Sequence, residues 1–295
     1  MKTAVIIVNY NDIQSTIEYV NKIKEYNIID KIVVVDNLST TEGALERLKE
    51  LENEKVYVIQ SDKNGGYNYG NNYGIKFLEE KNEQYDYFVI SNPDIDIEEK
   101  AIKNSLEVLK SNKEVAIVAP RMLNKDKNPI RRSAWKLRTF GLDVIHSTRF
   151  LEILFYKKLR AGEYLEKDYE KNELEVEAIS GAFFIIKNDI LKEIGLFDEN
   201  VFLFYEEDIL AKSLKDKNYK TISLNSESFI HYESQTIGKS FNYYNKVKKL
   251  YKSKMYYQTK YNKINGFQKS IFTILNVFRK LELIIEIPIR KILKK

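Results

Sequence analysis

Two clusters of acidic residues and one histidine are the side chains most able to do chemistry in this sequence. The segment DYFVISNPDIDI, residues 86–97, places Asn92, Asp94 and Asp96 directly after an apolar strand pattern. Polar groups in that position lie at the carboxyl edge of an open α/β sheet, where such sheets bind ligands. The alternative is a turn in which Asp94 or Asp96 caps the helix that EEKAIKNSLEVLK begins.

The second cluster, Glu206, Glu207 and Asp208, follows the aromatic run VFLFY. Carboxylates beside aromatic side chains can lie in a cleft of low dielectric constant, where their pKa rises toward the range of a general base. The alternative is a solvated helix N-terminus, where the helix dipole favours acidic side chains. His231, one of two histidines, ends a strand pattern and is a candidate metal ligand, although a single histidine more often has a structural role.

Polar residues also follow each of the first four predicted strands. They are Asn9, Tyr10 and Asn11 after the first strand, Asp36 and Asn37 after the second, Asn64, Gly65 and Gly66 after the third, and Asn92, Asp94 and Asp96 after the fourth. Four strand ends that deliver polar groups to one sheet edge predict a nucleotide site. Neither the G-x-G-x-x-G fingerprint nor the G-x-x-x-x-G-K-[ST] phosphate loop is present. Small residues before a later strand would allow close packing against a ligand: Ser180, Gly181 and Ala182.

The elements that must position these residues alternate between strand and helix in the first half of the chain. Strand patterns at 3–11, 31–37, 56–61, 85–94 and 115–120 are separated by helical patterns at 13–23, 42–52, 64–81 and 98–111. Such alternation with short loops predicts a parallel sheet with right-handed crossovers. Residues 124–175 look like a basic, aromatic loop region with some helix. Strand patterns return at 176–187 and 220–234 around a helix at 205–217, and residues 240–295 are predicted to be helical.

Composition limits the classes of protein that fit. The chain has 295 residues and no cysteine, which excludes disulfides, thiol catalysis and cysteine-bound zinc. Its start, MKTAVIIVNYN, enters a strand pattern and does not resemble a signal peptide, and no window reaches the roughly 18 apolar residues of a spanning helix. The net charge is +5, with the basic surplus concentrated in residues 239–295. This asymmetry indicates an anionic surface, nucleic acid or membrane, and no nucleic-acid-binding signature is present.

The ordered set VNYN, VVVDN, NGG, NPD, SGAFF, GLFDENVFLFYEED and H-x-E-S resembles the inverting family-2 glycosyltransferases of the GT-A fold, and most of all their bacterial rhamnosyltransferase-like branch. The resemblance covers about residues 1–240. It implies an α/β fold with a Rossmann-like, mostly parallel sheet flanked by helices and a C-terminal helical extension. The implied GT-A domain is 1–239, with a nucleotide-binding half at about 1–120 and an acceptor-binding half at about 121–239, and the basic, aromatic helical tail is 240–295.

The resemblance also implies roles for residues around the donor. Asn9 and Tyr10 would line the base pocket, and Asp36 would accept the N3–H of uracil or thymine. Other residues would border the nucleotide, namely Asn64, Gly65, Gly66, Asn71 and Asn92, or the donor sugar and acceptor, namely Ser180, Gly181 and Ala182. NPD resembles the D-x-D metal motif with Asn92 in place of the first acid. Asp94 and His231 would therefore hold a divalent cation, Mg²⁺ or Mn²⁺, on the donor diphosphate.

The family's Glu-Glu or Glu-Asp pair matches Glu206 and Glu207, which implies Glu207 as the catalytic base. The family often continues with one residue and then an Asp, whereas this chain has Asp208 and Ile209, so Asp208 is the alternative base. One base suffices for an inverting transfer, because the acceptor hydroxyl displaces the nucleoside diphosphate in a single step.

The implied reaction moves a sugar from a dTDP- or UDP-sugar, with rhamnose suggested by the branch alone, to a hydroxyl of a saccharide acceptor. A lipid-linked acceptor in the synthesis of cell-surface polysaccharide such as capsule is the expected setting, at the cytoplasmic face of the cell membrane. One alternative is a nucleotidyltransferase acting on sugar phosphates, which would carry a Gly-rich, basic loop where this chain has NYNDIQ. The other is a catalytically silent carbohydrate-binding scaffold.

Two basic segments are predicted to meet the acceptor and the membrane. Arg131, Arg132 and Trp135 lie between the metal motif and the base in sequence, and they are expected to shape the acceptor site. The tail repeats apolar residues at helical spacing among basic ones, and Pro288 is expected to break the helix near Ile287. A basic amphipathic helix can lie in the headgroup region of an anionic membrane. The alternative is that the apolar stripe packs on the catalytic domain or on a second copy of the chain, as in a homodimer.

Overall fold

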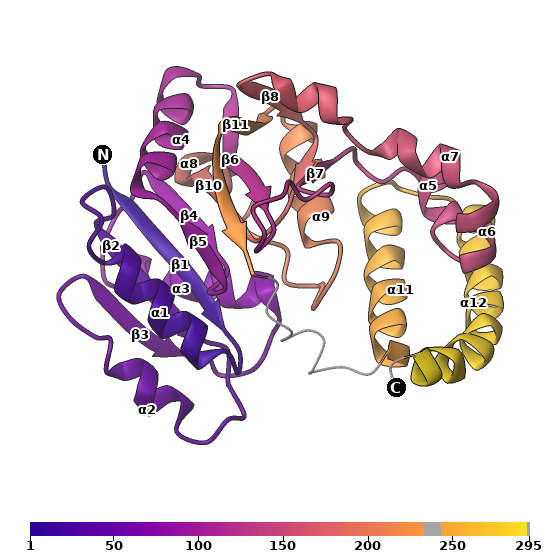
Figure 1. The fold of residues 1–295 in the computed structure, drawn as a ribbon, viewed down its shortest axis with the longest axis horizontal. Coiled ribbons are helices and arrows are strands. Elements are labelled where there is room, and N and C mark those ends of the chain that lie inside the picture. Colours follow the sequence, from indigo (N-terminus) through magenta and orange to yellow (C-terminus); the bar gives the residue numbers. More distant parts are fainter. Residues whose placement is uncertain (233–242, 294–295) are drawn as a thin grey trace.

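The computed structural model describes residues 1–232 and 243–293. Within these ranges, the centre of the protein is a nine-stranded sheet in the order β3-β2-β1-β4-β10-β6-β11-β5, with β8 also paired to β11 (Figure 1). The strands are β1 (Thr3–Asn9), β2 (Lys31–Asp36), β3 (Val56–Gln60), β4 (Tyr87–Ser91), β5 (Ile95–Ile97), β6 (Val115–Leu123), β8 (Glu173–Val176), β10 (Phe183–Lys187) and β11 (Lys220–His231).

The predicted α/β sheet is confirmed, but its strands do not all run the same way. β3, β2, β1 and β4 are parallel, whereas β10 lies antiparallel between β4 and β6. All five residues of β4 are buried, as expected for a strand that is covered on both faces. β5 and β8 also run antiparallel, each to β11. The mostly parallel sheet implied by the resemblance is therefore confirmed, and the apolar pattern of a buried strand does not encode which strands are the antiparallel ones.

Helices cover both faces of the sheet, because alternate side chains of each strand point to opposite sides. Val5 and Ile7 of β1 pack with α1 (Ile13–Ile23), α2 (Ala44–Lys49) and α4 (Glu99–Ser111). Ala4 and Ile6 pack with α3 (Tyr67–Glu80), α8 (Asn188–Glu193) and α9 (Glu206–Asp216). The result is a three-layer arrangement with its loops at the carboxyl edge of the sheet.

The NPD segment forms the turn between β4 and β5. The short strand β5 pairs antiparallel with β11, so that Ile95 lies opposite His231. The following helix α4 begins at Glu99 with Glu98 at its N-cap, and the Asp96 carboxylate accepts a hydrogen bond from the Lys22 ammonium at 2.5 Å. The alternative in which Asp94 or Asp96 caps that helix is therefore wrong.

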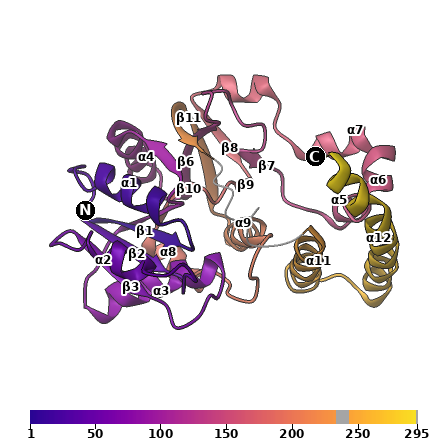
Figure 2. The same cartoon turned by 60° about the horizontal axis from the view of Figure 1, so that its bottom comes forward.

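The region predicted as a basic loop with some helix contains three short helices, α5 (Phe140–Ile145), α6 (Arg149–Leu154) and α7 (Tyr156–Leu159). They follow β7 (Ala134–Trp135), which pairs with β9 (Ala178–Ile179). The tail forms α11 (Tyr243–Lys260) and α12 (Gly266–Leu293), which confirms its predicted helical character over the described residues. Figures 1 and 2 show α11 and α12 beside α5 and α6, at the end of the molecule away from β3.

The helical tail is packed onto the rest of the protein. Tyr257 of α11 is fully buried against Val201, Tyr205 and Ile209, and the Phe272 ring of α12 meets the Phe140 ring of α5 edge-on at 5.3 Å. Pro288 lies inside α12, so the predicted helix break is wrong: the exposed proline removes one backbone donor near the end of the helix, and the neighbouring turns continue. Within the described ranges, no helix combines the length and the low polarity that crossing a bilayer requires. The domain boundary near residue 239 stays a prediction.

Candidate active site

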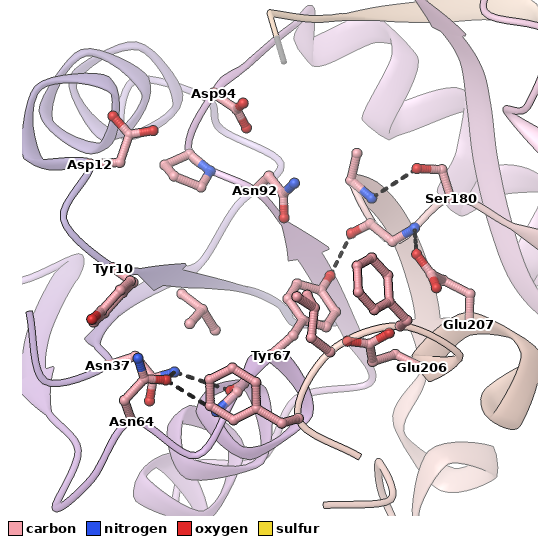
Figure 3. A pocket seen from close by; sticks show the side chains of 18 of the residues that line it. Tyr10, Asp12, Asn37, Asn64, Tyr67, Asn92, Asp94, Ser180, Glu206 and Glu207 are labelled. Carbon is pink, nitrogen blue, oxygen red and sulfur yellow. Dashed lines mark hydrogen bonds between the residues drawn. The ribbon is translucent and has the colours of Figure 1, made fainter. Parts of the chain in front are cut away.

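A cavity of about 520 Å³ opens at the carboxyl edge of the first strands (Figure 3). Tyr10 follows β1, Asn37 follows β2, Asn64 follows β3, and Asn92 and Asp94 follow β4, and all of them line this cavity. The prediction that four strand ends bring polar side chains to one site is therefore confirmed. The remaining wall comes from the turn between β9 and β10, from the loop before α9, from the first turn of α9 and from the end of β11.

Ten of the residues implied by the family resemblance line this cavity: Tyr10, Asn64, Gly66, Asn92, Asp94, Ser180, Gly181, Ala182, Glu207 and His231. Five others do not line it: Asn9, Asp36, Gly65, Asn71 and Asp208. Neither do the three residues predicted for the acceptor from their position in the sequence, Arg131, Arg132 and Trp135. The cavity is also lined by residues for which the sequence patterns predict no role, chiefly Asp12, Tyr67, Pro93 and Phe202–Phe204. Tyr67 directly follows the NGG turn, and the aromatic run adjoins the acidic cluster, so both had a signal in the sequence.

Asp94 and His231 come together through the pairing of two strands. Because His231 lies opposite Ile95 in the β5–β11 ladder, its Nε2 atom approaches the Asp94 carboxylate to 3.4 Å. Among the described residues, no group of three or more acidic or histidine side chains could hold a metal ion. The pair nevertheless fits a divalent cation, because Mg²⁺ is commonly held by one or two carboxylates together with substrate phosphates and water.

Glu207 is held in the cavity by the backbone of the β9–β10 turn. The Gly181 N–H donates to Glu207 Oε1 at 3.2 Å, and the Tyr67 hydroxyl donates to the Gly181 carbonyl. A Cβ atom at position 181 would lie 3.1 Å from Glu207 Oε1, so a glycine lets the carboxylate approach this closely. Burial raises the pKa of Glu207 above its ordinary value, which brings the carboxylate toward the range of an effective general base.

The family model described as Glycosyl transferase family 2 matches residues 4–195, well over half of the chain. The chain belongs to this family. The resemblance seen in the ordered motifs is thus confirmed at the level of the family, and Glu207 and His231 lie beyond the matched span.

Known proteins agree with this family and with the fold. A curated relative, the low-salt glycan biosynthesis hexosyltransferase Agl10 of Haloferax volcanii, is 28% identical over 209 residues, which is 69% of this chain and 58% of that protein. GalNAc-T7, solved with UDP, GalNAc and Mn²⁺, matches 79% of this chain and 44% of its own with a TM-score of 0.57 at 15% identity. Mannosyltransferase PcManGT of Pyrobaculum calidifontis, solved with GDP-Man and Mn²⁺, matches 80% of this chain and 58% of its own with a TM-score of 0.53 at 17% identity. The structural matches establish the GT-A fold.

The three consecutive acids of this family member have different surroundings. Glu206 and Glu207 line the cavity, and burial together with the charge of Glu207 raises the pKa of Glu206 to about 8. Asp208 lies outside the cavity wall and accepts a hydrogen bond from the Trp135 indole N–H at 3.2 Å. Burial raises the pKa of Asp208 to about 7, although Arg138 opposes the shift. The arrangement favours Glu207 over Asp208 as the base.

Asn9 and Asp36 lie behind the cavity wall, where they bond to each other. The Asn9 amide donates to Asp36 Oδ1 at 2.8 Å, and the Asp36 carboxylate also accepts from the Ser39 hydroxyl and from the Gln60 amide. Both side chains are fully buried. They fix the turns that present Tyr10 and Asn37 to the cavity. Direct contact of Asp36 with the nucleobase of the donor stays a prediction. Asn71 is equally buried and donates to the Tyr67 carbonyl.

The loop before α9 forms one wall of the cavity in a rarely populated conformation. Phe204 and Tyr205 both have φ of 71°, a left-handed backbone that non-glycine residues seldom adopt. Two consecutive residues of this kind persist only where their surroundings hold them. Here α11 does so, because the Ser253 hydroxyl donates to the Leu203 carbonyl at 2.8 Å and Tyr257 packs against Tyr205.

The basic residues proposed for the acceptor lie away from this cavity. Arg131 pairs with Glu163 on the surface, and Arg132 and Trp135 line a separate cavity of about 220 Å³. Trp135 reaches the catalytic region indirectly through its bond to Asp208. The structure therefore does not bring Arg131 or Arg132 to the base, and any role they have toward an acceptor stays a prediction.

Proposed function

We propose that this protein transfers a sugar, with inversion, from a nucleoside-diphosphate donor to a hydroxyl of a saccharide acceptor. The observation that carries the proposal is one cavity lined both by the Asp94–His231 pair and by the Glu207 carboxylate, which the Gly181 N–H holds. Figure 3 shows Glu206 and Glu207 entering from a different part of the wall from Asp94. A donor lying between them would present its diphosphate to the pair and its sugar to the base.

Each residue then has a defined task. Asp94 and His231 would hold a Mg²⁺ or Mn²⁺ ion, which as a Lewis acid neutralises the charge of the departing diphosphate. Glu207 takes the proton of the acceptor hydroxyl while that oxygen attacks the anomeric carbon from the face opposite the leaving group. The bond from that carbon to the diphosphate oxygen breaks in the same step, so the configuration inverts and no protein nucleophile is needed.

Uridine and thymidine diphosphate sugars are the donors we propose, with Tyr10 and Asn37 bordering the base. Staphylococcus aureus TarS, residues 1–349, was solved with UDP-GlcNAc and matches 93% of this chain and 71% of its own, with a TM-score of 0.57 at 14% identity. The hexosyltransferase relative supports a hexose as the transferred sugar. Rhamnose rests only on the resemblance to the rhamnosyltransferase-like branch.

We further propose a lipid-linked acceptor in cell-surface polysaccharide synthesis such as capsule, met at the cytoplasmic face of the membrane. α12 supports this setting, since Phe278, Leu281 and Ile285 are each more than half exposed along it. An amphipathic helix with such a face can lie in the interface of a membrane. The same face could instead join two copies of the chain, and an experiment with vesicles distinguishes the two.

Thermal stabilisation by a panel of nucleotide sugars with Mn²⁺ tests the proposed activity. A ligand at 100 times its Kd adds about 2.7 kcal/mol to the free energy of unfolding, so the right donor should raise Tm visibly above the free sugar phosphates. The stabilising donor is then supplied with acceptor saccharides, and the anomeric configuration of the product is read by NMR. Stabilisation by nucleoside triphosphates and sugar phosphates alone would instead favour the nucleotidyltransferase. Donor binding without transfer or hydrolysis would favour the silent scaffold.

A further inference from the structure

A second cavity of about 310 Å³ lies between α6, α11, α12 and the loop before α9. Five cationic side chains line it, together with two carboxylates, Glu152 and Glu286. The cationic residues are Arg149, Lys246, Lys254, Arg279 and Arg290. Arg149 pairs with Glu152, and Arg279 and Arg290 both pair with Glu286. The five cations still outnumber the two carboxylates of the lining, and this surplus of positive charge suits an anionic ligand.

Lys254 is the most informative of these cations, because it is only 4% exposed. Its ammonium donates to the carbonyls of Asp143 and His146 and to the Ser147 hydroxyl, at 3.1, 3.3 and 3.1 Å. These three acceptors are neutral, and burial lowers the pKa of Lys254 to about 8. An anion in the cavity would stabilise the charged form of this lysine.

The second cavity shares a wall with the active-site cavity. Phe204 lines both of them, and the same loop is fixed from the side of α11 by Ser253 and by the Lys249 ammonium, which lies 3.8 Å from the centre of the Phe202 ring. Phe204 is therefore part of the wall between the second cavity and the cavity of Glu207.

Exposed apolar side chains lie on two of the helices that line the cationic cavity. α6 and α12 are joined where the backbone N–H groups of Arg149 and Phe150 donate to the Glu282 carboxylate, at 2.8 and 3.0 Å. Both helices carry large apolar residues that are more than half exposed: Phe150, Ile153, Leu154, Ile274, Val277, Phe278, Leu281, Ile284 and Ile285. Apolar surface of this extent marks a membrane or protein contact.

We propose that the second cavity binds the phosphate or diphosphate group of a lipid-linked saccharide acceptor, while the apolar side chains of α6 and α12 enter the lipid. The inference rests on the proposed function and extends it to the acceptor. An anionic group beside an apolar chain matches the cations and the apolar residues together. Because Phe204 lines both cavities, a saccharide attached to that group would extend past this side chain toward Glu207. The donor diphosphate would occupy the other cavity, beside Asp94.

The test uses two double variants of the full chain that remove equal charge from the same helical lobe. Arg149→Ala with Lys246→Ala removes cations that line the cavity, and Lys248→Ala with Lys280→Ala removes exposed cations of α11 and α12 that do not. Each protein is co-sedimented with phosphatidylcholine vesicles that contain a polyprenyl diphosphate, or phosphatidylglycerol of equal total charge. Thermal stabilisation by inorganic pyrophosphate and by the nucleotide-sugar donor is measured alongside.

The unmodified protein should bind the polyprenyl-diphosphate vesicles more tightly than the phosphatidylglycerol vesicles. The cavity variant should lose this preference, with binding weaker by about tenfold or more, as expected when charge-assisted hydrogen bonds are lost. The control variant should keep the preference, and both should keep stabilisation by the donor. Equal losses in the two variants, or no preference in the unmodified protein, would overturn the proposal in favour of unspecific attraction. Stabilisation by free pyrophosphate without vesicle binding would show a soluble anion site instead. If the nucleotide-sugar donor does not stabilise the unmodified protein, that result would count against the proposed function, separately from this inference.

Discussion

Replacing Glu207 by glutamine should abolish most of the catalysis while leaving the cavity intact. The new Oε1 atom can accept the Gly181 N–H bond that now measures 3.2 Å, and the side chain keeps its size, so only the ability to take a proton is lost. Removal of a general base typically lowers kcat by a factor of about 10² to 10⁴, which corresponds to about 3 to 5 kcal/mol of transition-state stabilisation. Donor affinity should stay near its original value.

Glu207→Gln should also change how the stability of the protein depends on pH. Because burial raises the pKa of Glu207, the folded state favours the protonated carboxyl, and this group makes the protein less stable as pH rises through the folded pKa. Glutamine cannot ionise, so the variant should be at least as stable as the unmodified protein at pH 8. It also removes a charge that raises the pKa of Glu206.

The assay is release of nucleoside diphosphate at saturating donor, with the donor Kd measured by calorimetry and Tm by differential scanning. Asp208→Asn is the matched control, since Asp208 bonds to the Trp135 indole outside the cavity. A larger loss of kcat in Asp208→Asn than in Glu207→Gln, at equal Tm, would make Asp208 the base. Retention of kcat within a few-fold in Glu207→Gln would refute the assignment of a base at this position.

Three further predictions concern the cation, the loop and pH. Asp94→Ala should weaken Mn²⁺ binding in the presence of nucleoside diphosphate and abolish transfer with the fold retained, because it removes the carboxylate of the Asp94–His231 pair; calorimetric titration with Mn²⁺ checks this, and unchanged affinity would contradict the assignment. Gly66→Ala should lower the free energy of unfolding for two reasons: φ is +92°, and the new Cβ would lie 2.3 Å from the Phe202 carbonyl oxygen. Backbone strain alone costs about 1–3 kcal/mol, so the total loss should be larger than that. Gly195→Ala, with φ of +87° and open space around it, is the control, and equal losses in urea titration would show that the loop contact has no effect. kcat should decrease as the pH is lowered, because the Glu207 carboxylate must be ionised to act as the base. Since its pKa is raised, this decrease should begin at a pH above the ordinary range of a glutamate. A decrease only near pH 4, or one that persists in Glu207→Gln, would be inconsistent with this reasoning.

The strand and helix alternation could be predicted because each early strand is an apolar run and each early helix has an apolar stripe. The polar strand ends followed from the same pattern, and Asp94, His231 and Glu207 all line the cavity. The pattern of apolar and polar residues does not show which polar side chains bond to one another. The Asn9 amide donates a hydrogen bond to Asp36 behind the wall of the cavity, so position at a strand end alone does not show which residues face the cavity.

The loop residues escaped prediction for a different reason. Phe202 and Phe204 line the cavity only because the backbone turns through two left-handed residues, a conformation that their types disfavour and that contacts with α11 maintain. The position of Arg131 and Arg132 between two motifs predicts an acceptor role, but Arg131 pairs with Glu163 on the surface, away from the cavity. Long-range packing decides such positions, and a local pattern does not record it.

The pairing of β11 with β5 and β6 also determines when the site can exist during synthesis. Asp94 leaves the ribosome early, but its imidazole partner is at position 231, on a strand that pairs with β6, β8 and β5. Until that strand is made, β6 lacks a neighbour on one side and presents unpaired backbone groups. Contacts of such large sequence separation form late and slow folding. A nascent chain would therefore complete the first strand ends of the cavity early and remain without the Asp94–His231 pair until residue 231 is available. During that interval it would depend on protection of an open sheet edge.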